Sequence, residues 1–311
     1  MQETKYGQLV TLMPEEEDDY EAYDIELEET QKSSTSVWIR KGDLYYPSID
    51  AQINKVLLPG VYTIHQGQEV FAKKAKISED KLYNFSNSVS EKLLSEIELF
   101  WTKFEEFKNA EVVHKRGILL EGPPGTGKTS IINLICSQLI KKNGVVFKLR
   151  NERNFESYLE FIKLFRQIEP NRNFITIIED IDDYNNIKTD LLDLLDGKSQ
   201  FNGHIILATT NNSKNLEDTF LRPSRFDLRV LVGPPKDSIK EEYLVNKGFN
   251  AEELKDIIPK INKFTFADLK ELFITVKLLG YNLNTAIEKI LNPISKKNYL
   301  NQNSGATTLG I

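Results

Sequence analysis

The sequence contains one cysteine and three histidines, too few for two common kinds of site. Cys136 has no second cysteine with which to form an intrachain disulfide. The histidines, His65, His114 and His204, are scattered without the spacing of metal ligands. We therefore expect neither a disulfide framework nor a zinc site. Cys136 lies among apolar residues and is expected in the core.

Long apolar stretches and an excess of positive charge are also lacking. No apolar run reaches membrane-spanning length, and Met1–Thr4 lack the basic and apolar regions of a signal peptide. We therefore expect a soluble protein of the cytoplasm, or of the host cytoplasm if the source is viral. The net charge of −6 argues against extensive binding of a nucleic-acid backbone. Short basic clusters, at 73–76, 115–116 and 141–142, are expected to be solvated turns, with local nucleic-acid contacts as the alternative.

A glycine-rich stretch, GPPGTGKT at residues 122–129, matches the phosphate-binding pattern G-x-x-x-x-G-K-[ST] at every required position. An apolar strand at 117–121 precedes it, and a helix with apolar spacing follows at 129–140. In such a loop the backbone N–H groups surround phosphate oxygens, the lysine neutralises the phosphates and the threonine hydroxyl binds Mg²⁺. We therefore expect ATP and Mg²⁺ as cofactors. The expected binding residues are Gly122, Pro123, Pro124, Gly125, Thr126, Gly127, Lys128, Thr129 and Ser130.

Two further apolar runs end in polar residues. The run 174–178 is followed by Glu179 and Asp180, and the run 204–210 is followed by Asn211. Continuous apolar strands that end in acids are typical of the interior of a parallel sheet. Two arginines, Arg222 and Arg225, follow in the stretch LRPSRFD. Taken alone, these arginines would be interpreted as solvated surface residues.

Together these motifs resemble the AAA family of ring-forming ATPases. The resemblance covers roughly residues 85 to 296 and rests on GPPGTGKT, the acidic strand end, LLDLLDG, ATTN and LRPSRFD. Within the family the chain is similar to single-ring bacterial and viral members and to the mitochondrial AAA protein that handles the Rieske subunit, which share the Glu-Asp order. The resemblance implies an α/β fold: a P-loop parallel-sheet core, a C-terminal helical lid and, here, a small β-rich N-terminal domain.

The resemblance also implies roles for individual residues. Thr129 and Glu179 would hold Mg²⁺, Asp180 would polarise the attacking water, and Asn211 would fix that water near the γ-phosphate. Arg222 and Arg225 would reach the ATP of a neighbouring subunit, which implies a homo-oligomeric ring, expected to be a hexamer.

The sequence departs from the commonest family pattern in two places. Most members have Asp-Glu where this chain has Glu179-Asp180, so the water-activating carboxylate is one methylene shorter and hydrolysis is expected to be slower. No aromatic-hydrophobic-glycine pore loop is recognisable between the phosphate loop and the acidic strand, which argues against peptide threading. The aromatic residues of 155–165 are instead expected to face the core of one helix. The segment 265–268 lies where relatives place a small residue near the base.

The expected organisation has six parts: an acidic, mobile segment at 1–35, a β-rich domain at 36–77, a linker with an amphipathic helix at 78–114, the nucleotide-binding core at 115–235, the helical lid at 236–296 and a flexible tail at 297–311. The linker helix is expected over 88–107, and the lid helices are expected over 238–246, 251–258 and 266–279. Three roles remain open. The first is remodelling of a protein or protein assembly, with the client recognised by the N-terminal domain. The second is regulating or loading a nucleic-acid-processing factor, without direct binding of nucleic acid by this chain. The third is a slow ATP-dependent assembly switch.

Overall fold

The computed structural model describes residues 35–41, 44–51, 54–67, 69–75, 89–184, 186–196, 201–211, 216, 218–222 and 224–291. The expected acidic segment, apart from residue 35, and the expected tail at 297–311 lie outside the described residues. The chain divides into two compact units, Met1–Lys55 and Val56–Ile311. In the first unit, β1 (Thr35–Lys41) and β2 (Leu44–Ala51) form a two-stranded antiparallel sheet.

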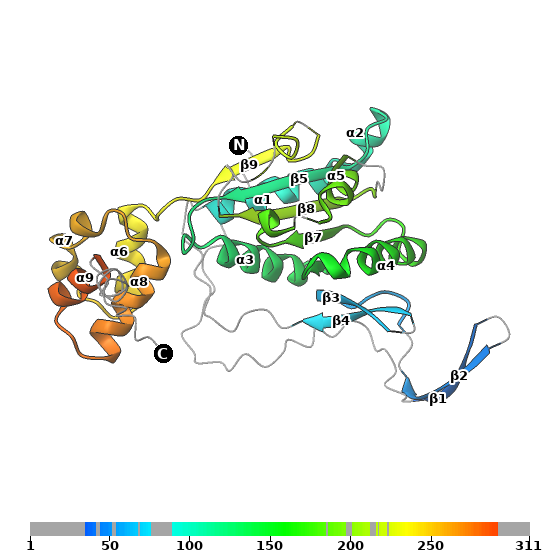
Figure 1. Cartoon of the computed structure of the whole chain (residues 1–311), viewed down its shortest axis with the longest axis horizontal. Coiled ribbons are helices and arrows are strands. Elements are labelled where there is room, and N and C mark those ends of the chain that lie inside the picture. Colours follow the sequence, from blue (N-terminus) through cyan, green and yellow to red (C-terminus); the bar gives the residue numbers. More distant parts are fainter. Residues whose placement is uncertain are drawn as a thin grey trace, which may run out of the picture. The chain divides into compact units, whose positions relative to one another are not determined.

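The second unit contains a seven-stranded sheet with the order β4-β3-β6-β7-β8-β5-β9 (Figure 1). Every neighbouring pair is parallel except β3 and β4. The predicted α/β fold with a parallel sheet is therefore confirmed. The strands are β3 (Gly60–Gln66), β4 (Val70–Ala75), β5 (Lys115–Glu121), β6 (Val145–Leu149), β7 (Phe174–Ile178), β8 (His204–Thr210) and β9 (Leu228–Leu231).

Helices cover both faces of this sheet, which explains why its central strands β7 and β8 are buried at every position. Successive residues of one strand enter opposite cores: Ile118 packs with α1 (Val89–Thr102) and α3 (Lys128–Lys141), whereas Leu119 packs with α4 (Phe155–Ile168) and α5 (Lys188–Asp196). Cys136 is buried in the first core, as expected. The aromatic residues of α4 belong to the second core, which confirms that they pack inside: Phe155, Tyr158 and Phe165 are buried and Phe161 is partly buried.

The β-rich region expected at 36–77 is divided between two sheets. Its second half, β3 and β4, extends the large sheet, because β3 pairs in parallel with β6 from Gly60–Val145 onward. Val61 and Tyr62 are buried, one in each core, as expected for an interior strand. β4 alternates between half-buried and exposed residues, which is typical of an edge strand. Residues 60–75 therefore belong to the same sheet as the phosphate loop.

A buried carboxylate fixes the chain where it enters this sheet. Glu169 accepts a hydrogen bond from the backbone N–H of Leu57 at 2.7 Å and pairs with Arg172, also at 2.7 Å. Arg172 in turn donates to the carbonyl oxygen of Leu57. The segment before β3 is thus held by side chains that follow α4.

The remaining elements include a helical lid with its own core of buried apolar residues. The helix expected at 88–107 is interrupted at Lys103, giving α1 and α2 (Phe104–Asn109). The predicted lid is helical, but the helix expected over 266–279 changes to π-helix at residue 274, and a last helix follows that the sequence did not predict. The lid elements are α6 (Asp237–Asn246), α7 (Ala251–Lys255), the 3₁₀ turn Ile258–Ile261, α8 (Phe266–Phe273), the π-helix Ile274–Leu278 and α9 (Leu283–Leu291); two further 3₁₀ turns in the core are Glu152–Asn154 and Ile181–Asp183.

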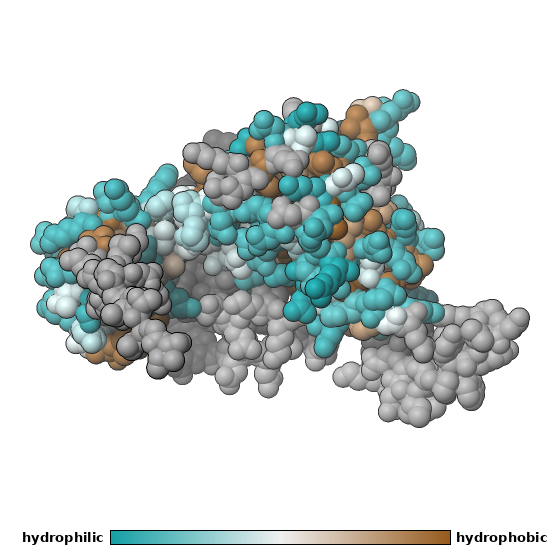
Figure 2. Space-filling model, in the orientation of Figure 1, coloured by the Kyte–Doolittle hydropathy of each residue, from teal (hydrophilic) through white to brown (hydrophobic). Residues whose placement is uncertain are grey.

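The visible surface of the described residues is mostly hydrophilic, with apolar residues in small patches (Figure 2). No helix in the part of the chain that the structure describes combines the length and apolar character needed to cross a bilayer.

Candidate functional site

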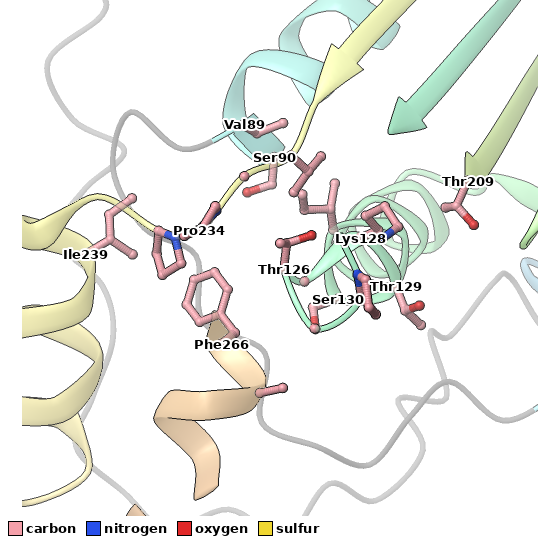
Figure 3. Close-up of a pocket in the computed structure, with 18 of the residues that line it drawn as sticks. Val89, Ser90, Thr126, Lys128, Thr129, Ser130, Thr209, Pro234, Ile239 and Phe266 are labelled. Carbon is pink, nitrogen blue, oxygen red and sulfur yellow. The ribbon is translucent and has the colours of Figure 1, made fainter. Parts of the chain in front are cut away.

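A cavity of about 700 Å³ opens beside the phosphate loop (Figure 3). Its wall is formed by the start of α1, the loop and first turn of α3, the ends of β7 and β8, the connection after β9, and the lid helices α6 and α8. Of the expected binding residues, all but Gly122 and Pro123 line this cavity. The sequence motif therefore lines this cavity.

The glycines give the loop its sharp turn. Gly125 and Gly127 have φ angles of 79° and 97°, in the left-handed region that side chains disfavour. Gly127 is also the N-cap residue of α3, so the free N–H groups of the first helical turn face the end of the loop. Successive N–H groups at a helix N-terminus form a site for anions such as phosphate.

Lys128 is buried and makes three hydrogen bonds. Its Nζ donates to the carbonyl oxygens of Gly122 at 2.7 Å and Pro123 at 3.0 Å, and to Oδ1 of Asn211 at 2.8 Å. Burial lowers the pKa of the Lys128 ammonium, and the nearby carboxylate of Asp180 opposes that shift. The lysine is therefore held by the loop itself, with its charge directed toward the ends of the neighbouring strands.

Asn211 connects this lysine to Asp180. Its Nδ2 donates to Oδ1 of Asp180 at 2.9 Å, and the backbone N–H of Asp180 donates to Oγ1 of Thr209, also at 2.9 Å. We call Lys128, Asn211 and Asp180 the polar relay. Its three members come from three segments that are distant in sequence, and the parallel sheet brings them together because the strands all end at one edge.

Asp180 has an unusual backbone and an unusual environment. Its φ of 49° is in the left-handed region, which Asp tolerates better than most residues. Burial raises the pKa of its carboxyl group, and the negative charges of Asp182, Asp183 and Glu179 raise it further. Such repulsion among acids is relieved by a bound cation, so this turn has the donor chemistry that Mg²⁺ prefers.

Glu179 is not part of the cavity wall. Its carboxylate forms an ion pair with Lys148 of β6, and both side chains are partly exposed. Sequence reasoning did not identify Lys148, because the two residues are on neighbouring strands and far apart in the chain. The only sequence signal for this ion pair is that Lys148 lies near the end of a strand whose neighbour in the sheet is followed by Glu179.

The structure separates the two arginines by environment. Arg225 is only 13% exposed and forms a two-pronged pair with Asp196, with Nε and Nη2 each 2.6 Å from a carboxylate oxygen. This pair raises the pKa of the Arg225 guanidinium. Arg222 is exposed, and its side chain makes no hydrogen bond or ion pair with any of the described residues. Asp196 was also missed by sequence reasoning.

Comparison with known proteins gives a family match over the same residues. Residues 118–234 match the model of the "ATPase family associated with various cellular activities (AAA)". Similar proteins include an ATP-dependent zinc metalloprotease FtsH of Lactiplantibacillus plantarum, which is 31% identical over 194 residues. This match covers 54% of the present chain and 26% of the relative.

Two relatives from other domains of life are also similar. Protein SAV of Sulfolobus acidocaldarius is 29% identical over 75% of this chain and 34% of its own length. The ATPase family gene 2 protein of Schizosaccharomyces pombe is 24% identical over 62% of this chain and 26% of its own. The matched regions thus span about a quarter to a third of these relatives.

In the described part of this chain, no group of three or more His, Cys, Asp or Glu residues could hold a metal ion.

Proposed function

We propose that the chain hydrolyses ATP as a homo-oligomeric ring, expected to be a hexamer, and uses the energy to remodel a protein or protein assembly. The match of residues 118–234 to the AAA ATPase family model supports this proposal. The observation that carries the ATPase part is the polar relay beside the phosphate loop. Hydrogen bonds join Lys128 to the amide of Asn211, and Asn211 to the carboxylate of Asp180. The pKa of Asp180 is raised. A perturbed carboxylate in a cleft next to a phosphate site has the properties of a general base.

Each residue of the site has a proposed task. Lys128 and the N–H groups from Gly125 to Ser130 would hold the triphosphate, while Thr129 and Glu179 would hold Mg²⁺. When bound, Mg²⁺ would neutralise charge on the phosphates. Asp180 would accept the proton of the attacking water, and Asn211 would orient that water.

The proposal of a homo-oligomeric ring depends on Arg222 and Arg225. AAA ATPases usually form oligomeric rings, and an arginine supplied by a neighbouring subunit can stabilise the charge of the transition state. Arg222 has the better environment for this task, because it is exposed and unpaired among the described residues. Arg225 would support the segment that carries it through its pair with Asp196.

The proposal is tested first by Asp180→Asn. An amide cannot accept the proton of water, so hydrolysis should fall by about 10²-fold or more while ATP binding persists. Asparagine also tolerates the left-handed backbone, so the fold should be retained. Asp190→Asn, at an exposed position on α5, is the matched control. Unchanged turnover in Asp180→Asn would contradict the proposed base.

The second test is Lys128→Ala, which should abolish binding of ATP because the loop loses its buried ammonium. Lys141→Ala is the control, since this lysine is exposed in the last turn of the same helix. Undiminished affinity of Lys128→Ala for ATP and Mg²⁺, measured by titration with a fluorescent nucleotide, would exclude the loop as the phosphate site.

The shared active site is tested by mixing inactive subunits. Arg222→Ala supplies an intact carboxylate and Asp180→Asn supplies an intact arginine, so mixed rings should regain part of the activity that each lacks alone. The same test applies to Arg225→Ala. If subunit exchange is verified and no mixture recovers activity, the ring with shared sites must be abandoned.

The name of one relative supports the remodelling role. The first relative is named an ATP-dependent protease, an enzyme that acts on proteins. We propose that the β-rich N-terminal region, residues 36–77, recognises the client, in a soluble, cytoplasmic protein. The Glu179-Asp180 order supports assignment of this chain to the single-ring members of the family, and it supports slow hydrolysis of ATP. Identifying the proteins that co-purify with Asp180→Asn in ATP tests this role, because a hydrolysis-blocked remodeller should retain its client.

The net charge of −6 disfavours a nucleic-acid-linked role, the main alternative. Salt-sensitive stimulation of hydrolysis by DNA would favour that alternative. Turnover that stays negligible in assembled, client-bound rings would favour the assembly switch.

A further inference from the structure

The part of the cavity away from the polar relay has an apolar wall, to which Val89, Leu134, Pro234, Ile239 and Phe266 contribute. Among the described residues that line the cavity, the only side-chain carboxylate and the only side-chain amide belong to Asp180 and Asn211, at the phosphate end. The apolar end is therefore suited to a flat, largely uncharged group, and the described residues of its wall offer no carboxylate or amide to read the edge of such a group.

The aromatic ring of Phe266 lies against the phosphate loop. A Cβ atom placed on Gly127 would lie 3.1 Å from Cδ2 of Phe266, so the ring packs directly over the turn that begins α3. In Figure 3 the ring lies in the cavity between Pro234 and Thr126.

The backbone around Phe266 holds the ring in place. The N–H of Ala267 donates to the carbonyl oxygen of Gly125 at 3.1 Å, which ties the start of α8 to the phosphate loop. Thr265 and Asp268 form a reciprocal capping box at the same helix end. The ring also meets Tyr243 edge to face, with 5.8 Å between the ring centroids. An aromatic ring fixed in this way loses little freedom when a ligand arrives.

We propose that Phe266 is the stacking platform for the nucleobase, and that the site accepts purine nucleotides by stacking and shape, binding ATP and GTP with similar affinity. This inference rests on the proposed nucleotide-binding function and deepens it. Stacking of a base on an aromatic side chain tolerates different bases because every base has a π-face. The lysines of the cavity wall, Lys236, Lys247 and Lys270, are hydrogen-bond donors, and adenine and guanine present the same N7 acceptor.

The test compares ligands with and without a base. Binding of ATP, GTP and inorganic tripolyphosphate, each with Mg²⁺, is measured by calorimetry for the full chain and for Phe266→Leu, Phe266→Ala and Phe266→Tyr. Phe266→Leu keeps an apolar side chain but removes the π-face. Phe266→Tyr keeps the ring. Thermal unfolding of each variant shows whether the lid still folds.

We expect Phe266→Leu and Phe266→Ala to bind ATP and GTP about 5- to 150-fold more weakly, the range for loss of one stacking contact. Tripolyphosphate should bind to all variants with the same affinity, and Phe266→Tyr should resemble the unsubstituted chain for all ligands. The unsubstituted chain should bind ATP and GTP within about tenfold of each other, because an apolar pocket discriminates weakly between similar shapes.

Three results would overturn the inference. Equal weakening of ATP and tripolyphosphate would mean that Phe266 supports the phosphate loop rather than the base. Unchanged or tighter ATP binding in both Phe266→Leu and Phe266→Ala would mean that the ring does not stack. A preference for ATP over GTP of about a hundredfold would require a hydrogen-bond reader. These results leave the proposed ATPase intact, whereas failure of the unsubstituted chain to bind any of the three ligands would remove both proposals.

Discussion

The pair between Arg225 and Asp196 allows the two arginines of LRPSRFD to be separated experimentally. Two parallel hydrogen bonds of 2.6 Å join the guanidinium to the carboxylate, and Arg225 also donates to the carbonyl oxygen of Thr219. An exposed ion pair contributes about 0.2–1 kcal/mol, and a hydrogen bond to a charged group about 1.5–3 kcal/mol. With Arg225 mostly buried and Asp196 about one-third exposed, we expect an intermediate coupling of about 1–2 kcal/mol.

A double-mutant cycle measures this coupling. Arg225→Ala, Asp196→Ala and the double variant are unfolded in urea, and the deviation from additivity gives the pair energy. The control cycle uses Arg229 and Glu121, where only Nη2 of an exposed arginine approaches the carboxylate, at 3.0 Å. Its coupling should be at most about 0.5 kcal/mol. A value below about 0.5 kcal/mol for the Arg225 cycle would refute a structural role for the pair.

The same variants separate stability from catalysis. Arg222→Ala should change the free energy of unfolding by less than about 0.5 kcal/mol, as expected for an exposed side chain without described partners. If Arg222 serves the neighbouring site, turnover should nevertheless fall by about 10³-fold or more. Arg225→Ala should lose both stability and activity. Full activity of Arg222→Ala in assembled rings would mean that Arg225 serves the neighbouring site, or that neither arginine does.

Three further predictions concern other parts of the site and sheet. Lys148→Met should lower the Mg²⁺ concentration needed for half-maximal hydrolysis about two- to fivefold, because an ammonium no longer competes for Glu179; a raised requirement would contradict this. Gly122→Ala should destabilise the fold by about 1–3 kcal/mol in urea unfolding, since a Cβ there would lie 2.1 Å from the carbonyl oxygen of Val232; unchanged stability would show that the loop can shift. Burial holds the pKa of His204 well below its ordinary 6.5, so the unfolded chain takes up the proton first as the pH falls. The free energy of unfolding should therefore decrease as the pH falls below 6.5, by at most about 1.4 kcal/mol per pH unit. A free energy of unfolding that stays constant or increases as the pH falls from 7 to 5 would contradict this.

The sequence predicted the elements whose signals are local. β5, β7 and β8 are short apolar runs that end in polar residues, and their bounds agree with the prediction to within two residues. The phosphate loop was predicted because its glycines and lysine are contiguous. The polar relay was predicted only as separate residues with roles implied by resemblance; its hydrogen bonds required coordinates.

Contacts between distant segments were not predictable from the sequence. The extension of the sheet by β3 depends on pairing with β6, and nothing within β3 identifies its partner. The pairs Lys148–Glu179 and Asp196–Arg225 likewise join residues that only the sheet and its connections bring together. The position of Phe266 over Gly127 depends on how the lid meets the loop. In each case the physical cause is non-local packing, for which periodicity gives no signal.

The pairing of β3 with β6 also sets an order of events during synthesis. Of the strands in the seven-stranded sheet, β3 and β4 are synthesised first, and they can form a hairpin at once because they are neighbours in sequence. The opposite edge of β3 must wait until β5, α3 and β6 have emerged. During that interval the nascent chain presents an unpaired strand edge carrying Val61 and Tyr62, which is the kind of surface that invites wrong pairing. A chain that ends before Val145 would therefore be prone to aggregate. We expect holdase chaperones to bind the nascent protein until β6 is available to pair with β3.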